Sequence, residues 1–129
     1  MKREYPKSDY ESLEVYRISR VLAARIWDIV DRWGSFEKDT IGDQLIRSSD
    51  SIGASIAEGV GIGTSADFIR FAKMARSSLF ETKHWIRKAY SERLITDNDM
   101  EELTALIEDL RPRLHAYITA VDSHGTFGR

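Results

Sequence analysis

Four segments of the chain carry apolar residues at intervals of three or four, the pattern of a helix with one buried face. They predict helices at about residues 10–33, 40–58, 65–91 and 97–121. In the last segment the intervals alternate strictly between three and four, which is a heptad seam typical of helices packed side by side. That seam consists of Met100, Leu103, Ile107, Leu110, Leu114, Tyr117 and Val121.

The first two predicted helices carry more contact surface than one neighbour needs. Beside its buried row the first helix has a second row, which indicates another contact within the bundle or between subunits. The second helix is crowded with small residues between Ser48 and Ala57, although Ser and Gly disfavour helices. Close approach of another helix is the usual compensation, so we expect the tightest helix contact here. The second row of the first helix is Leu13, Tyr16, Ala23, Trp27 and Val30.

The predicted helices are separated by recognisable stops and caps. Gly34 ends the first helix, and Asp39 or Thr40 is expected to cap the second. Pro112 lies inside the fourth helix and predicts a bend there. Helices of this length with short connections predict an all-α fold, an antiparallel up-and-down four-helix bundle. We expect one domain over residues 1–129, with flexible ends at 1–8 and 123–129.

A glycine-rich turn follows the second helix. Gly59, Gly61 and Gly63 are expected to form a hinge, after which Thr64 or Ser65 caps the third helix. A glycine loop before a helix can cradle phosphate. Here the glycines follow a helix rather than a strand, and neither nucleotide-binding glycine motif is present, so a turn is favoured.

Composition limits the classes of function. The chain has 129 residues, of which 42% are hydrophobic, enough for one cored domain. Its 19 Lys and Arg nearly balance 21 Asp and Glu, and the net charge of −2 gives no general attraction to nucleic acid or anionic lipid. No cysteine is present, which excludes disulfides and thiolate zinc sites. Without an export signal or a span long enough for a bilayer, we expect a cytoplasmic protein with no membrane partner.

No pattern of catalytic or metal-binding residues appears. His84, His115 and His124 are too far apart in sequence for paired metal ligands at helical spacing. Carboxylates from Asp97 to Glu108 weakly resemble a calcium loop, but the required glycine is absent and the heptad seam runs through them. We therefore predict no enzyme activity, no cofactor, no metal and no small-molecule substrate.

The third predicted helix carries a one-sided set of cations, which we call the basic stripe. Such a face is usually solvated or paired with an acidic neighbour, for example the start of the fourth helix. Nucleic-acid binding or contact with another subunit is the alternative. The basic stripe consists of Arg70, Lys73, Arg76, Lys83, Arg87 and Lys88.

Other polar residues lie near the glycine turn in sequence. Arg47 is a candidate partner for Asp50, one helical turn away. We also predict that Arg47, Glu58, Arg76 and Glu81 form a structural network of ion pairs beside the hinge rather than an active site.

The middle of the chain resembles a known bacterial family, the four-helix-bundle proteins found as reading frames inside intervening sequences of 23S ribosomal RNA genes. The family reads roughly Q-[IL]-x-R-[AS]-[AS]-x-S-I, then I-A-E-G, a short loop and F-x-x-F-x-x-x-A-x-x-S-x-x-E. An apolar residue often stands where this chain has Asp50, and a loop cation where it has Ile62. The matching positions are Gln44, Leu45, Arg47, Ser48, Ser49, Ser51, Ile52, Ile56, Ala57, Glu58, Gly59, Phe68, Phe71, Ala75, Ser78 and Glu81.

This resemblance implies a bundle that assembles as a ring, typically of five subunits, without enzyme activity. A related group, the accessory proteins of diversity-generating retroelements, is similar in fold and binds nucleic acid and a reverse transcriptase through a strongly basic surface. The net charge of −2 argues against that behaviour in strong form. The leading hypothesis is a self-assembling scaffold or interaction protein, and the alternative is an RNA- or DNA-binding accessory protein that uses the basic stripe.

Overall fold

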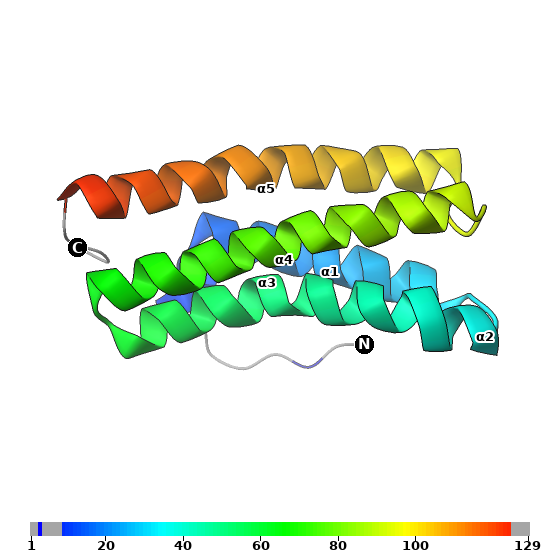
Figure 1. Ribbon diagram of the computed structural model, residues 1–129, viewed down its shortest axis with the longest axis horizontal. Helices are drawn as coiled ribbons and strands as arrows, with labels where there is room; N and C mark the ends of the chain where they lie inside the picture. The colour runs from blue at the N-terminus through cyan, green and yellow to red at the C-terminus, as the bar shows by residue number, and fades with distance from the viewer. Residues whose placement is uncertain (1–2, 4–8, 125–129) are drawn as a thin grey trace.

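Four long helices form an antiparallel up-and-down bundle (Figure 1), as the sequence predicts. The computed structural model describes residue 3 and residues 9–124, without the side chains of 123 and 124. None of the helices in that part of the chain has the length and hydropathy of a membrane-spanning segment. The elements in order are the 3₁₀ turn η1 (Asp9–Ser12), α1 (Glu14–Asp31), α2 (Ser35–Glu37), the π-helical turn η2 (Lys38–Gly42), α3 (Asp43–Ile62), α4 (Ser65–Ser91) and α5 (Asp97–His124).

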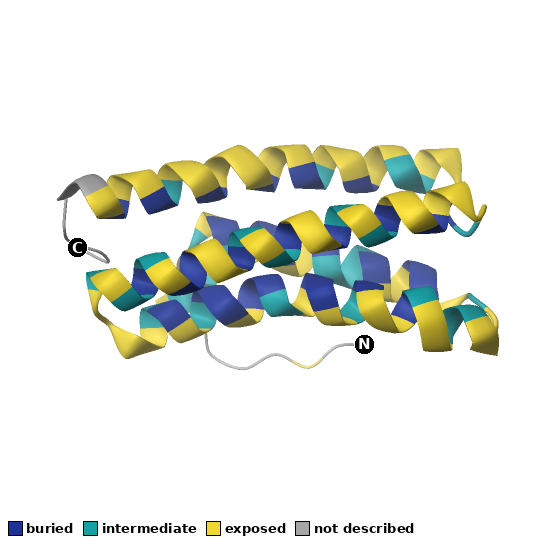
Figure 2. Ribbon diagram, viewed as in Figure 1, coloured by how far each residue is buried: buried dark blue, intermediate teal, exposed yellow. Residues whose placement is uncertain are grey.

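One apolar core runs along the bundle axis (Figure 2), where each long helix buries one side. The predicted stripe of α1 is buried from Val15 to Ile29. Trp33 closes one end of the core, because its indole N–H donates to the carbonyl of Leu94 at 3.0 Å. The heptad seam of α5 faces inward, and Ile118, next to the seam residue Tyr117, is also buried.

The small residues of α3 bring it close to α4. The hydroxyls of Ser48 and Thr82 lie 3.0 Å apart, and those of Ser51 and Ser78 lie 2.6 Å apart. A Cβ added at Gly59 would come within 3.0 Å of the Phe71 Cβ, so a side chain there would push the helices apart. Short hydroxyls satisfied across the helix pair therefore offset the poor helix propensity of this segment.

The opposite helix pair is joined by charge. Arg25 of α1 donates to Asp99 and Glu102 of α5, each at 2.9 Å. Arg32 lies 3.7 Å from the second oxygen of Asp99. Because the Asp99 side chain is only 16% exposed, this cluster orients α5 on α1 more firmly than a solvated pair would.

The connection from α1 to α3 does not contain the helix cap that was predicted at Asp39 or Thr40. The chain becomes helical again at Ser35, with extended Gly34 as the preceding residue, and continues through η2 into α3. The Thr40 hydroxyl donates to the carbonyl of Phe36 at 2.8 Å, so it bonds inside a helical turn rather than capping one. That cap prediction is wrong because the helix had already begun.

The predicted three-glycine hinge is also corrected. Gly59 and Gly61 lie within α3, which ends at Ile62, and only Gly63 turns the chain, in the left-handed conformation with φ of 86°. Gly59 lies inside the helix, and a glycine is needed there because a side chain would collide with α4. Thr64 caps α4 by accepting from the Asp67 N–H at 3.2 Å.

At the other end of the chain, α5 runs unbroken through Pro112. Arg111 and Arg113 are exposed on either side of it and pair with Glu108 and Asp109. The helix continues to His124, past its predicted end at residue 121. Apart from residues 3, 123 and 124, the ends predicted to be flexible lie outside the described residues.

Two alanine substitutions test the close approach of α3 to α4. Gly61→Ala meets no atom within 4 Å and should raise the free energy of unfolding by up to about 1 kcal/mol, because Ala favours helix. Gly59→Ala should lower it by about 1–3 kcal/mol, because the Cβ forces the helices apart. Urea unfolding followed by circular dichroism compares the two. Equal effects would contradict the packing account.

The cap of α4 predicts a pH dependence. The Thr64 hydroxyl, 2.8 Å from the Asp67 carboxylate, and Arg70 at 3.1 Å hold the pKa of Asp67 below its usual 3.8. Ionised Asp67 therefore stabilises the fold above the unfolded-state pKa, and this contribution is lost as pH falls through the folded-state pKa.

Asp67→Asn should accordingly reduce stability at neutral pH and lose its effect in acid, as measured by urea unfolding across that range. Thr64→Ser keeps the hydroxyl and should preserve the pH dependence. If Asp67→Asn lowers the free energy of unfolding by the same amount at neutral and acidic pH, the stabilisation by Asp67 is not electrostatic.

Candidate functional site

A groove lies between α1 and α3, and we call it the α1–α3 groove. Its volume is about 510 Å³. It forms where Ala, Gly and Ser on the two helices face each other, since such short side chains leave space between the backbones. The groove is lined by Tyr10, Tyr16, Ser19, Arg20, Ala23, Ala24, Trp27, Ser49, Asp50, Gly53, Ala54 and Ala57.

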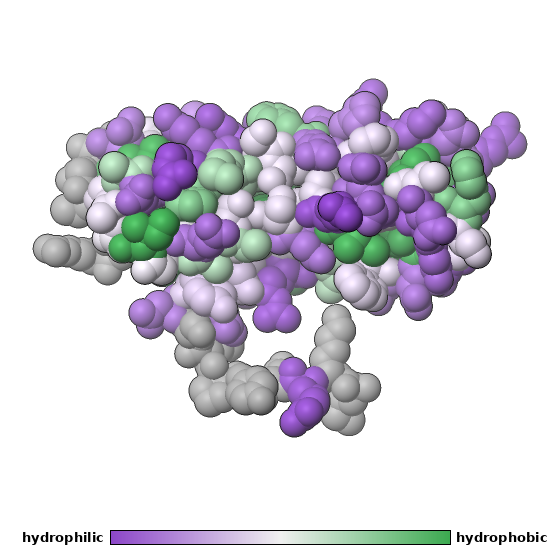
Figure 3. Space-filling view, turned by 60° about the horizontal axis from the view of Figure 1, so that its bottom comes forward, coloured by the Kyte–Doolittle hydropathy of each residue, from purple (hydrophilic) through white to green (hydrophobic). Residues whose placement is uncertain are grey.

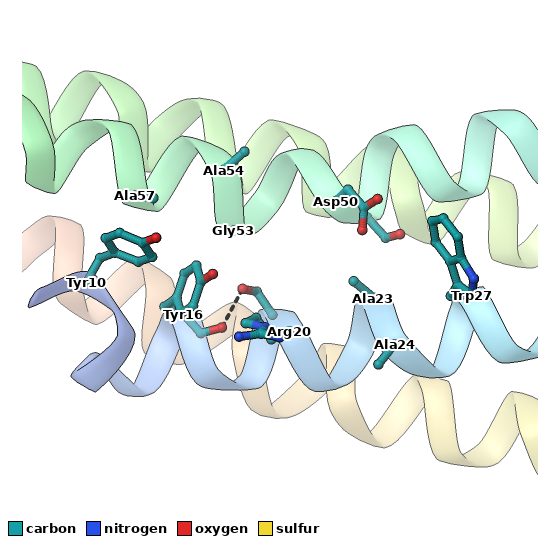
Figure 4. A pocket seen from close by; sticks show the side chains of 12 residues that line it. Tyr10, Tyr16, Arg20, Ala23, Ala24, Trp27, Asp50, Gly53, Ala54 and Ala57 are labelled. Carbon is teal, nitrogen blue, oxygen red and sulfur yellow. Dashed lines mark hydrogen bonds between the residues drawn. The ribbon is translucent and has the colours of Figure 1, made fainter. Parts of the chain in front are cut away.

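Aromatic residues stand at both ends of the α1–α3 groove (Figure 4). Tyr10 and Tyr16 meet edge to face at one end, with ring centroids 4.9 Å apart. Trp27 stands at the other end with 54% of its surface exposed, although it is large and apolar. The groove is therefore lined by small residues between aromatic ends, and about half of Trp27 is left uncovered by the described chain.

Asp50 is the one acid that lines the groove. In Figure 4 its carboxylate lies on the Trp27 side of the groove. No hydrogen bond or ion pair reaches Asp50 from any described residue, and partial burial raises the pKa of its carboxyl group. The suggested Arg47 partner is wrong, because Arg47 binds Asp43 at 3.1 Å instead. The groove thus holds a partly desolvated carboxylate that a cation would stabilise.

The groove has no catalytic arrangement. The hydroxyls of Ser19 and Ser49 donate to the carbonyls of Tyr16 and Ile46 on their own helices, at 2.6 and 3.3 Å. No histidine lines the groove, and no hydrogen bond joins either serine to Asp50, the one acid in the lining. Among the described residues, no cluster of His, Asp and Glu could hold a metal ion.

The basic stripe lies along α4. At its ends, Arg70 pairs with Asp67 at 3.1 Å and Lys88 pairs with Glu92 at 3.0 Å. The other four members take part in no ion pair with any described residue; Lys73 and Arg87 are exposed, and Arg76 and Lys83 are half-buried.

The stripe does not pair with α5 within this chain, because no ion pair joins these two helices in the described residues. The acids at the start of α5 bind elsewhere: Asp99 and Glu102 hold Arg25 of α1. Asp97 accepts a 2.5 Å hydrogen bond from the Tyr90 hydroxyl, which raises the pKa of Tyr90.

The predicted polar network is not formed in the structure. Arg47 binds Asp43, and Glu81 accepts from the Trp85 indole at 3.2 Å. No ion pair in the described part of the chain joins any two of Arg47, Glu58, Arg76 and Glu81. Arg47 and Glu81 each bond to a residue one turn away on their own helix, a choice of partner that proximity in sequence to the turn did not reveal.

Exposed apolar residues also occur away from the groove. Met74 and Phe80 on α4 are 46% and 52% exposed. On the side shown in Figure 3, hydrophobic surface appears as separate patches between polar side chains rather than one continuous area. Sequence patterns flagged the second apolar row of α1 and the small residues of α3, but not that both open onto one groove.

Comparison with known proteins places this geometry in a family context. A family model described as 23S rRNA-intervening sequence protein matches residues 11–116. A crystal structure of a protein of unknown function from the S23 ribosomal protein family of Bacteroides thetaiotaomicron is similar, with 26% identity and a TM-score of 0.71. The match covers 81% of this chain and 97% of that one. No curated protein matches the chain.

Proposed function

This chain belongs to the 23S rRNA-intervening sequence protein family, and we propose that it is a non-enzymatic scaffold that assembles with copies of itself. The observation that carries the proposal is the open α1–α3 groove with Trp27 at its rim. A large apolar side chain that is more than half exposed beside an apolar hollow is typical of a contact surface.

The polar groups of the groove support binding rather than catalysis. Its serines are bonded to their own helices, and its single carboxylate has no partner that would make it an acid or a base. Five subunits are the number that the family resemblance favours, and we place the assembly in the cytoplasm. In this proposal the scaffold needs no cofactor, membrane or small-molecule substrate.

Self-assembly is tested by light scattering and sedimentation at micromolar concentrations. The chain has a mass of 14.8 kDa, and the expected mass is a multiple of it. Ala54→Arg places a long charged side chain in the groove from an exposed position and should return the protein to the monomer mass. Ala116→Arg makes the same change on exposed α5 and should leave the assembly intact. A wild-type monomer would refute the proposal.

A second candidate function is binding to RNA or DNA through the basic stripe. It is favoured by one observation: Lys73, Arg76, Lys83 and Arg87 have no ion-pair partner in the described chain. Four unpaired cations along one helix can follow a phosphate backbone.

Binding of a structured RNA, measured by fluorescence anisotropy, tests this candidate. With four phosphate contacts, the affinity should fall by about 100-fold between about 50 and 200 mM salt. Lys73→Gln with Arg87→Gln should weaken binding, whereas Arg111→Gln with Arg113→Gln removes equal charge from α5 and should not. Undetectable binding at low salt, or equal losses in both double variants, would rule this role out.

A further inference from the structure

The basic stripe surrounds an exposed aromatic side chain. Phe80 is 52% exposed, and Arg76 and Lys83 lie one helical turn before and after it on the same side of α4. Neither cation forms an ion pair with a described residue, as noted above. This face therefore presents a protruding ring between two cations that are free to pair elsewhere.

The α1–α3 groove has the opposite form and charge. It is hollow, its lining is rich in Ala and Ser, and Trp27 and Asp50 line one end. Asp28 and Glu58 lie on the outer sides of the same two helices, are exposed, and form no ion pair in the described chain. Arg20 is the one cation that lines the groove. Within the lining the charges of Asp50 and Arg20 cancel, so the negative charge of this face comes from Asp28 and Glu58 beside the groove.

The two faces lie on different sides of the bundle. The helix pairs α1–α3, α3–α4, α4–α5 and α1–α5 are in contact, so α4 is diagonally opposite α1. By helical spacing, Arg76, Phe80 and Lys83 face outward on the α5 side of α4, away from the groove. One copy can therefore offer both faces at the same time, each to a different neighbour.

From this complementarity we propose that the α1–α3 groove binds the α4 face of a second copy of this chain. Phe80 enters the groove against Trp27, and Arg76 and Lys83 reach Asp50 and the acidic rim. The inference rests on the proposed self-assembly and adds the two surfaces that meet. A pairing of like faces would bring basic stripe to basic stripe or acid to acid, which costs energy.

The contact is heterologous, since each copy uses the groove toward one neighbour and the α4 face toward the other. Such contacts close into a ring when the rotation between copies allows it, and otherwise extend into a filament. The stripe is then occupied inside the assembly, so assembly and nucleic acid compete for the same cations.

Disulfide trapping tests which surfaces meet. The chain has no cysteine of its own, so only introduced cysteines can form a cross-link. Ala54→Cys marks the groove, and Ser77→Cys marks exposed α4 one turn before Phe80. Under mild oxidation, a mixture of the two single variants should form a covalent dimer, and neither variant should do so alone. The double variant should form a ladder of covalently linked chains.

The outcomes separate this inference from the proposed function. Assembly seen by light scattering without the mixed disulfide overturns the inference and leaves self-assembly standing. A groove variant that cross-links to itself as readily as to the α4 variant also overturns it, because that result means like faces pair. A monomer mass overturns both.

Charge exchange provides a second measurement. Asp50→Lys alone, or Arg76→Glu with Lys83→Glu, should lower the association constant at least about tenfold by placing like charges together. A chain that carries all three changes should lose less association free energy than the two separate losses added together, because Asp50→Lys again faces an opposite charge while the rim acids are unchanged. Circular dichroism confirms that each variant is folded. Losses that simply add in the combined variant would refute the contact.

Discussion

The structure depends on the close approach of α3 and α4. Hydroxyl pairs join Ser48 to Thr82 and Ser51 to Ser78, and Gly59 leaves room for the aromatic residues of α4. Larger side chains in this contact would separate the helices and open the core that Ile52 and Leu79 fill. Small residues on α3 therefore set the spacing on which the rest of the bundle is built.

The same choice of residues has a different effect on the other side of α3. Toward α1, Gly53 approaches Tyr16 closely, while Ala54, Ala57 and Ala23 leave the α1–α3 groove open. On the far side α1 is tied to α5 by the Arg25 cluster, which fixes it in place. The groove thus follows from ordinary packing constraints and needs no catalytic group to explain it, which fits the proposal of a contact surface.

The sequence predicted the fold well and the site only in part. Apolar spacing identified the helices and their buried faces, because a core imposes that period directly. It placed the hinge wrongly at Gly59 and Gly61, because a glycine required for close packing looks the same in sequence as a glycine required for a turn. It paired Arg47 with Asp50, although Asp43 is equally accessible on the previous turn. The groove was missed because it needs the relative positions of two helices.

The most direct test of the central claim, that the α1–α3 groove is covered by another copy, is ¹⁹F NMR of 5-fluorotryptophan at Trp27. The signal is assigned with Trp27→Phe and followed as protein concentration rises. The account predicts that it shifts and loses its solvent-isotope effect as assembly proceeds, while Trp33, which is half-buried in the bundle, stays unchanged. A Trp27 signal that remains solvent-exposed in the assembled protein would contradict it.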